Sequence, residues 1–254
     1  MPGTVADLAE EAFTRAPMNR PLQALFVAII AVPQLAIYAL QPDSSAYVEL
    51  AGLLKPAVML SSWQRWLQDP KFILVLVLLS FERFVYTMVW LFPAHFVHFA
   101  QMYIRPLLLK TTGKGKPLDC IVSLFWLSKI FQFGSMFGFY FSVGPLPAVA
   151  SISLFRWVLG LQLMLLGQML NAAIYNAIGK AGVYYGYRLG VTVPWVTGFP
   201  FSVVPHPQYV GTCIFVTGVN IFCATEAHVR AGWFNLTAVQ VLYYVYMALV
   251  EDYL

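Results

Sequence analysis

The sequence predicts an all-α, polytopic integral membrane protein: a helical bundle of five to six spans with a proline-broken interfacial segment in its C-terminal half. Of the 254 residues, 60% are hydrophobic and 10% are charged, whereas soluble domains carry about a quarter charged residues. The mean hydropathy is +0.71. The apolar residues also gather in separate runs, each near the roughly twenty residues that a helix needs to cross a bilayer.

The apolar runs give the predicted spans, which in chain order are residues 22–40, 72–99, 120–143, 153–178, 209–224 and 233–250. Pro33 should kink the first of them. The last two are short, so we expect a tight helical hairpin that crosses the membrane fully or only in part. A polar stretch at 41–71 follows the first span. Its apolar patch at 58–60 and the rings of Trp63 and Trp66 suit an interface.

Residues 184–211, YYGYRLGVTVPWVTGFPFSVVPHPQYVG, cannot be a plain membrane span, although apolar runs flank them. Their four prolines exclude a continuous helix, because proline lacks the backbone donor and restricts the residue before it. Aromatic rings and two ionisable side chains, Arg188 and His206, lie among the prolines. This composition is typical of the membrane–water interface or of a cavity at that depth. We therefore expect the chemistry of the protein in this segment.

The basic residues are unevenly distributed over the connections between spans. The connection 101–119 carries Arg105, Lys110, Lys114 and Lys116, whereas 144–152 carries no basic residue. Basic connections face the cytosol. This rule places the N-terminus, the proline-broken segment and the C-terminus on the cytosolic side of the membrane.

Charge and motif content exclude several other classes. The net charge is only +4 and the basic residues are scattered between spans, which favours membrane topology and predicts no nucleic-acid partner. The three cysteines lack metal-ligand spacing, and no carboxylate or cysteine completes a metal set with His95 and His98. We therefore expect no metal. No cleavable signal peptide is evident. The weakly amphipathic N-terminal segment could be a targeting sequence, but its acidic residues argue against a mitochondrial one. No glycine-rich nucleotide loop, G-x-S-x-G or H-E-x-x-H motif occurs.

The charged residues Glu82, Arg83 and Lys129 lie deep inside predicted spans. Charges within a membrane are paired or functional. Glu82 and Arg83 are adjacent, so they project about 100° apart on a helix and should not pair with each other. The sequence predicts instead a structural ion pair between Glu82 and Lys129 of the next span.

Two glycines, Gly160 and Gly167, share one face of the fourth span. Helix packing is the favoured interpretation, because small residues let membrane helices approach. The alternative is a notch that admits a flat ligand ring. Asn171 and Asn176, further along the same helix, need polar partners.

Two acidic residues, Glu251 and Asp252, directly follow the last apolar run. They could simply mark the end of a span. Carboxylates at a helix C-terminus oppose the helix dipole, however, so a positive group should lie nearby. His206, between two prolines, is either structural or a proton donor or base that titrates near neutral pH. Tyr209 adds a hydroxyl group and Gly211 a point where backbone can approach a ligand closely.

Residues 159–211 resemble the phospholipid methyltransferases, small membrane enzymes that N-methylate phosphatidylethanolamine. LGLQLMLLGQML at 159–170 resembles the glycine-bearing helix of the family, and VTGFPF at 196–201, followed by HPQYVG at 206–211, resembles its proline-rich core. Glu251 and Asp252 fall where the family has an acidic pair. The form HP-x-Y-x-G is also similar to the isoprenylcysteine carboxyl methyltransferases and the sterol reductases. The resemblance implies a methyltransferase-like membrane domain at 71–254, preceded by an extension at 1–70 with one extra span.

The resemblance also implies S-adenosyl-L-methionine as the methyl donor. The G-x-G of the family falls on Leu165, Leu166 and Gly167, where only the second glycine is present, and the second acidic residue is Asp252 in place of Glu. The implied catalytic residues are His206 and Glu251. The implied cofactor-binding residues are Leu165, Leu166, Gly167, Tyr187, Arg188, His206, Tyr209, Gly211, Glu251 and Asp252.

The family chemistry suggests a role for each kind of side chain. Glu251 would hold the amino group or hydroxyls of the cofactor. Tyr187, Trp195 or Tyr209 would face the sulfonium through a cation–π contact. Arg188 would bind the lipid phosphate or the cofactor carboxylate, because a guanidinium forms paired hydrogen bonds with either.

The expected function is N-methylation of phosphatidylethanolamine, or of its mono- and dimethyl derivatives, toward phosphatidylcholine. The substrate would be a phospholipid in the bilayer, and the expected location is the endoplasmic reticulum membrane, with a mitochondrial membrane as the alternative. Two other functions stay open. One is a catalytically silent structural subunit of a membrane complex, suggested by Leu165 and by the chain ending shortly after Asp252. The other is carboxyl methylation of isoprenylcysteine. The oligomeric state stays open as well.

Overall fold

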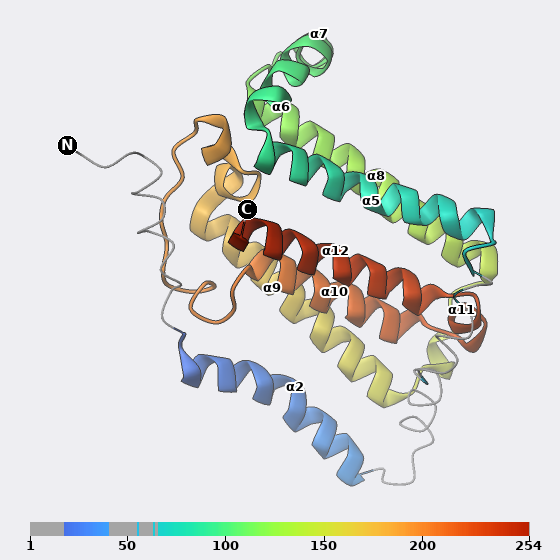
Figure 1. Cartoon of the computed structure of the whole chain (residues 1–254). Coiled ribbons are helices and arrows are strands. Elements are labelled where there is room, and N and C mark those ends of the chain that lie inside the picture. Colours follow the sequence, from blue (N-terminus) through green and yellow to red (C-terminus); the bar gives the residue numbers. More distant parts are fainter. Residues whose placement is uncertain (1–17, 41–54, 56–62, 64–65, 254) are drawn as a thin grey trace.

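A computed structural model describes residues 18–40, 55, 63 and 66–253. In these residues all regular structure is helical, which confirms the predicted fold class (Figure 1). The long helices are α2 (Arg20–Leu40), α5 (Pro70–Leu91), α8 (Pro117–Val143), α9 (Leu154–Val183), α10 (Pro207–Cys223) and α12 (Trp233–Tyr253). The short elements are α6 (Pro93–Phe99), η1 (Ala100–Ile104), α7 (Arg105–Thr112), η2 (Val149–Ser151), η3 (Gly186–Leu189) and α11 (Glu226–Arg230).

Helices α2, α5, α8, α9 and α12 are long and apolar enough to cross a membrane. The chain is therefore a multi-pass membrane protein. Helix α10 has 17 residues and packs along α9 and α12, with α11 in the connection to α12 (Figure 1). This arrangement agrees with five to six spans ending in a hairpin. The apolar patch predicted at 58–60 lies outside the described residues.

The second predicted span is shorter than its apolar run. Helix α5 ends at Leu91, and a separate helix, α6, begins at Pro93. The reason is that Pro93 has no backbone N–H to continue the ladder of α5. The residues that follow, through η1 and α7 to Thr112, are also helical. They form an arm at one end of the bundle (Figure 1).

Helices α9 and α10 meet through glycine on both sides. A Cβ atom on Gly167 would lie 2.7 Å from the backbone nitrogen of Phe215, and one on Gly211 would lie 2.8 Å from the carbonyl oxygen of Gly167. A Cβ on Gly160 would similarly lie 3.0 Å from Cβ of Phe222. The helix-packing interpretation of the glycine stripe is therefore confirmed, since the two backbones are too close for any side chain between them.

The charged residues Glu82, Arg83 and Lys129 form one cluster between α5, α8 and α12. Lys129 Nζ lies 2.9 Å from Glu82 Oε1, as predicted, and donates to the hydroxyl of Tyr244 at 3.1 Å. The expectation that Glu82 and Arg83 stay apart was wrong, because Arg83 Nη2 lies 2.9 Å from Glu82 Oε2. Both side chains are buried, and the flexible arginine bends back to keep its charge paired inside the bundle.

One end of the bundle collects the elements that matter for the site. The start of α2, the arm α6–α7, the segment that follows α9 and the end of α12 all lie there (Figure 1). The predicted topology requires this arrangement, since it places these parts of the chain on one side of the membrane.

Candidate active site

The segment between α9 and α10 leaves helical geometry at defined points. Gly179 interrupts α9 with a φ of 64°, and Tyr185 and His206 adopt left-handed backbone with φ of 54° and 48°. Non-glycine residues rarely adopt this conformation, and functional sites are where it concentrates. Pro207 then starts α10, a position at which proline suits a helix. The prolines therefore shape a folded wall instead of a span.

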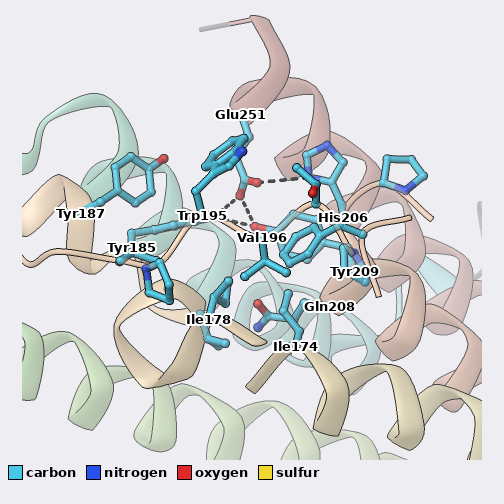
Figure 2. A pocket seen from close by; sticks show the side chains of 18 of the residues that line it. Ile174, Ile178, Tyr185, Tyr187, Trp195, Val196, His206, Gln208, Tyr209 and Glu251 are labelled. Carbon is cyan, nitrogen blue, oxygen red and sulfur yellow. Dashed lines mark hydrogen bonds and ion pairs between the residues drawn. The ribbon is translucent and has the colours of Figure 1, made fainter. Parts of the chain in front are cut away.

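This wall encloses a cavity of about 420 Å³ (Figure 2). Its remaining sides come from Trp90 of α5, Ile174 and Ile178 of α9, and the last turn of α12. Most of the lining is aromatic or aliphatic. A cavity of this size with few polar groups is typical of a small-molecule site.

The polar part of the cavity is organised by Glu251. Its Oε1 atom accepts hydrogen bonds from the hydroxyls of Tyr185 and Tyr209, whose oxygens lie 2.5 Å apart (Figure 2). Both tyrosines are buried, whereas the Glu251 side chain remains 12% exposed. Three elements distant in sequence thus hold one carboxylate in place at the cavity.

His206 supplies the positive partner that the two acidic residues require. Its Nδ1 lies 3.3 Å from Glu251 Oε2 and its Nε2 lies 3.1 Å from Asp252 Oδ1. Burial alone would lower the pKa of His206, but the hydrogen bond that its ring donates to Glu251 and the charges of Glu251 and Asp252 outweigh the effect of burial. The pKa of His206 is therefore raised above its usual value, and the ring can bind and release a proton between two carboxylates.

The phospholipid methyltransferase family model matches residues 155–254. This range contains the hydrogen-bonded site residues described above, Tyr185, His206, Tyr209, Glu251 and Asp252. Residues 155–254 are therefore similar in sequence to the phospholipid methyltransferases. The resemblance read from the motifs is confirmed for this region.

Two curated relatives of this family are both named phosphatidyl-N-methylethanolamine N-methyltransferase. The protein from Arabidopsis thaliana is 49% identical over 69 residues, which cover 26% of this chain and 40% of that protein. The protein from Saccharomyces cerevisiae is 30% identical over 102 residues, which cover 39% of this chain and 46% of that protein. The chain thus spans less than half the length of either relative. No solved structure matches the chain.

Five of the site residues expected from the methyltransferase resemblance line the cavity: Tyr187, His206, Tyr209, Glu251 and Asp252. Arg188 does not line it. Its guanidinium lies 4.2 Å from the centre of the Trp90 ring, and Trp90 does line the cavity. Arg188 is therefore separated from the cavity by one aromatic ring.

The residues at the expected methyltransferase G-x-G lie elsewhere. Leu165 is 70% exposed on the outside of α9, Leu166 is buried, and Gly167 packs against Gly211 of α10. None of these four residues lines the cavity. The side chain of Leu165 therefore does not narrow the cavity. Leucine at this position gives no steric reason to expect a catalytically silent protein.

The cavity residues that sequence reasoning did not assign to the site include Met18, Gly182 and Tyr185. Two of them had a local signal: Gly182 follows Gly179 where the apolar run of α9 gives way to aromatic residues, and Tyr185 belongs to the same YYGY cluster. Met18 had none, because it precedes the first span and reaches the site only through tertiary structure.

Proposed function

We propose that this protein transfers methyl groups from S-adenosylmethionine to the amino group of phosphatidylethanolamine or its mono- and dimethyl derivatives, toward phosphatidylcholine. The observation that carries the proposal is the position of Glu251. It lies in the methyltransferase-matching region and in the cavity, held by Tyr185 and Tyr209 and facing His206. The names of both relatives support the monomethyl lipid as one acceptor.

The cavity residues fit the proposed donor. Glu251 and Asp252 can accept hydrogen bonds from its ammonium and ribose hydroxyl groups. The rings of Tyr187 and Trp195, both in the cavity wall, offer the π faces that attract a sulfonium cation, at about 0.5–2 kcal/mol per contact. When bound, S-adenosylmethionine supplies an electrophilic methyl group.

The protein must also orient the acceptor amine and remove a proton from it. His206 is suited to accept that proton, because Glu251 and Asp252 stabilise the imidazolium that results. The fixed carboxylate of Glu251 keeps the ring and both tyrosine hydroxyls in position without reorganisation during the reaction. We assign His206 and Glu251 the catalytic roles on these grounds.

Other expected site residues take supporting roles in the proposal. Arg188, stacked on Trp90, is our candidate for the phosphate of the acceptor lipid. Leu166, Gly167 and Gly211 would act through packing, by letting α9 and α10 approach closely enough to place Tyr209 beside Glu251. We place the protein in the endoplasmic reticulum membrane, on the family resemblance alone.

The test is expression in cells that lack their own phospholipid methyltransferases, followed by incubation of the membranes with S-adenosylmethionine labelled in its methyl group. We expect label in mono-, di- and trimethylated phosphatidylethanolamine, and its distribution identifies the preferred step. Inserted, folded protein that leaves these lipids unlabelled would refute the proposal. Label in prenylated peptide would then identify an isoprenylcysteine methyltransferase, and label in neither acceptor would favour a silent subunit.

A further inference from the structure

Helix α2 lies outside the region that matches the methyltransferase family, yet the chain that leads into it reaches the cavity. Met18, just before the helix, is one of the lining residues. Along its length α2 makes few contacts, and only 6% of its apolar window is buried. A helix so exposed to lipid gains little from packing, so the contacts that it does make are informative.

At the N-terminal end of α2 these contacts include the turn at 198–204, which has two faces. One face carries Phe201 into the cavity wall. The other face meets α2, where the backbone N–H of Asn19 donates to the carbonyl oxygen of Ser202 at 2.7 Å. The rings of Phe26 and Phe199 also lie 6.3 Å apart. The start of α2 therefore lies directly behind the wall.

Gln23 joins the two parts of this wall through a single amide group. Its Nε2 donates to the carbonyl oxygen of Val203 at 2.6 Å and contacts Met18 Sδ at 3.5 Å. The side chain is half-buried and Val203 is buried. A buried carbonyl that loses its donor is costly, so Gln23 holds the turn against the helix and Met18 against the cavity at the same time.

We propose that the first turn of α2 is a positioning element that sets the affinity of the site for its membrane-borne acceptor, with Gln23 as the central residue. The proposal rests on the function proposed above. A water-soluble donor reaches the cavity from the aqueous side, whereas a phospholipid must enter from the bilayer, where α2 is exposed. Figure 2 shows Ile174 and Ile178 on the side of the cavity away from Glu251, and they belong to α9, against which α2 packs. The glycerol and acyl chains would lie on this apolar side.

The same helix contains a matched control. Gln34 is also half-buried, and its Nε2 donates to Oε1 of Gln162 at 2.8 Å, at the opposite end of α2 from the cavity. Methionine has a similar length to glutamine but cannot donate a hydrogen bond. Gln23→Met and Gln34→Met thus each remove a side-chain hydrogen bond that holds α2 in place. Only the hydrogen bond of Gln23 is made to the cavity wall.

The experiment measures initial rates in phosphatidylcholine vesicles over a range of phosphatidylmonomethylethanolamine and S-adenosylmethionine concentrations. We expect Gln23→Met to raise the KM for the lipid about three- to tenfold, in line with the loss of one buried hydrogen bond. The KM for S-adenosylmethionine and all constants of Gln34→Met should stay within about twofold of wild type. An unchanged lipid KM in Gln23→Met, or an equal rise in Gln34→Met, would overturn the proposal.

A second measurement does not depend on turnover. Phosphatidylmonomethylethanolamine with a diazirine in its sn-2 chain is photolysed in the same vesicles, and labelled peptides are identified by mass spectrometry. We expect labels within 18–26, 174–178 and 196–204 that excess unlabelled lipid suppresses, and a labelling pattern that leaves out 18–26 would contradict the proposal. Wild-type protein that makes no methylated lipid would refute the proposed function, whereas this labelling would still decide whether the wall contacts lipid.

Discussion

The hydroxyl oxygens of Tyr185 and Tyr209 lie 2.5 Å apart, and both hydroxyls donate to the same oxygen of Glu251. Tyr185 lies two residues after the end of α9, Tyr209 belongs to α10 and Glu251 belongs to the last turn of α12. The triad of side chains thus ties the three C-terminal elements together at the cavity, which makes its geometry sensitive to single substitutions.

Removing one of these hydroxyls should weaken catalysis more than it weakens the fold. A hydrogen bond to a charged group contributes about 1.5–3 kcal/mol, so we expect Tyr185→Phe and Tyr209→Phe each to lower kcat/KM by about 10- to 100-fold. The control is Tyr184→Phe, which removes a hydroxyl bonded to Tyr175 at 2.7 Å and not to Glu251. Equal losses in all three variants would show that the triad has no special role.

The activity should depend on pH through His206. Its pKa is raised because the hydrogen bond and charges of Glu251 and Asp252 outweigh the effect of burial. In the proposed function neutral His206 accepts the proton, so kcat/KM should increase with pH as the imidazolium deprotonates, with a midpoint above the usual histidine value of about 6.5. Asp252→Asn removes a charge that stabilises the imidazolium, and the midpoint should move to lower pH.

The exposed His98 of α6 provides the control, since His98→Asn should leave the pH profile unchanged. A midpoint unmoved in Asp252→Asn would argue against His206 as the acceptor.

The packing of α9 on α10 should tolerate no side chain at Gly167. A Cβ there would lie 2.7 Å from backbone nitrogen of Phe215, so Gly167→Ala should destabilise the protein by about 1–3 kcal/mol. Gly138 of α8 has open space around its Cβ position, and Gly138→Ala should be neutral or stabilising because alanine favours helix. Thermal unfolding of both purified variants in the same detergent makes the comparison. Gly167→Ala melting at the wild-type temperature would mean that the two helices are further apart than described.

Neutralising Glu82 should destabilise the bundle strongly. Glu82→Gln would leave Arg83 and Lys129 without their counter-ion between α5, α8 and α12, a kind of change that costs about 3–5 kcal/mol. Glu226 pairs with Arg230 at an exposed site, so Glu226→Gln should have no measurable effect. Denaturation in detergent monitored by tryptophan fluorescence compares the two variants, and equal stability would refute the structural role of the buried pair.

Much of this architecture follows from the sequence, because hydropathy sets the length and order of membrane helices. The ends of helices were harder to predict: apart from Glu82 and Arg83 the run at 72–99 is apolar, and the structure divides it at Pro93. The Arg83–Glu82 pair was missed because ideal helix geometry ignores how far a long side chain bends to stay paired.

The candidate site was predictable in part. The prolines, His206 and the acidic pair carry a local signal, and the structure gathers them at one cavity. The G-x-G register placed Leu165 and Gly167 in the site, whereas Leu165 faces outward and Gly167 faces α10. The contact of Gln23 with Val203 joins residues 180 positions apart in the sequence, and no local sequence pattern predicts it.

The most direct test of the central claim is methyl transfer by purified protein carrying Glu251→Gln. Wild-type protein, Glu251→Gln and Tyr184→Phe are compared in vesicles containing phosphatidylmonomethylethanolamine and labelled S-adenosylmethionine. We predict label in the dimethyl lipid with wild-type protein and Tyr184→Phe, and a loss of at least about 100-fold with Glu251→Gln. Label transfer by Glu251→Gln at the wild-type rate would contradict the assignment of this cavity as the methyltransferase site.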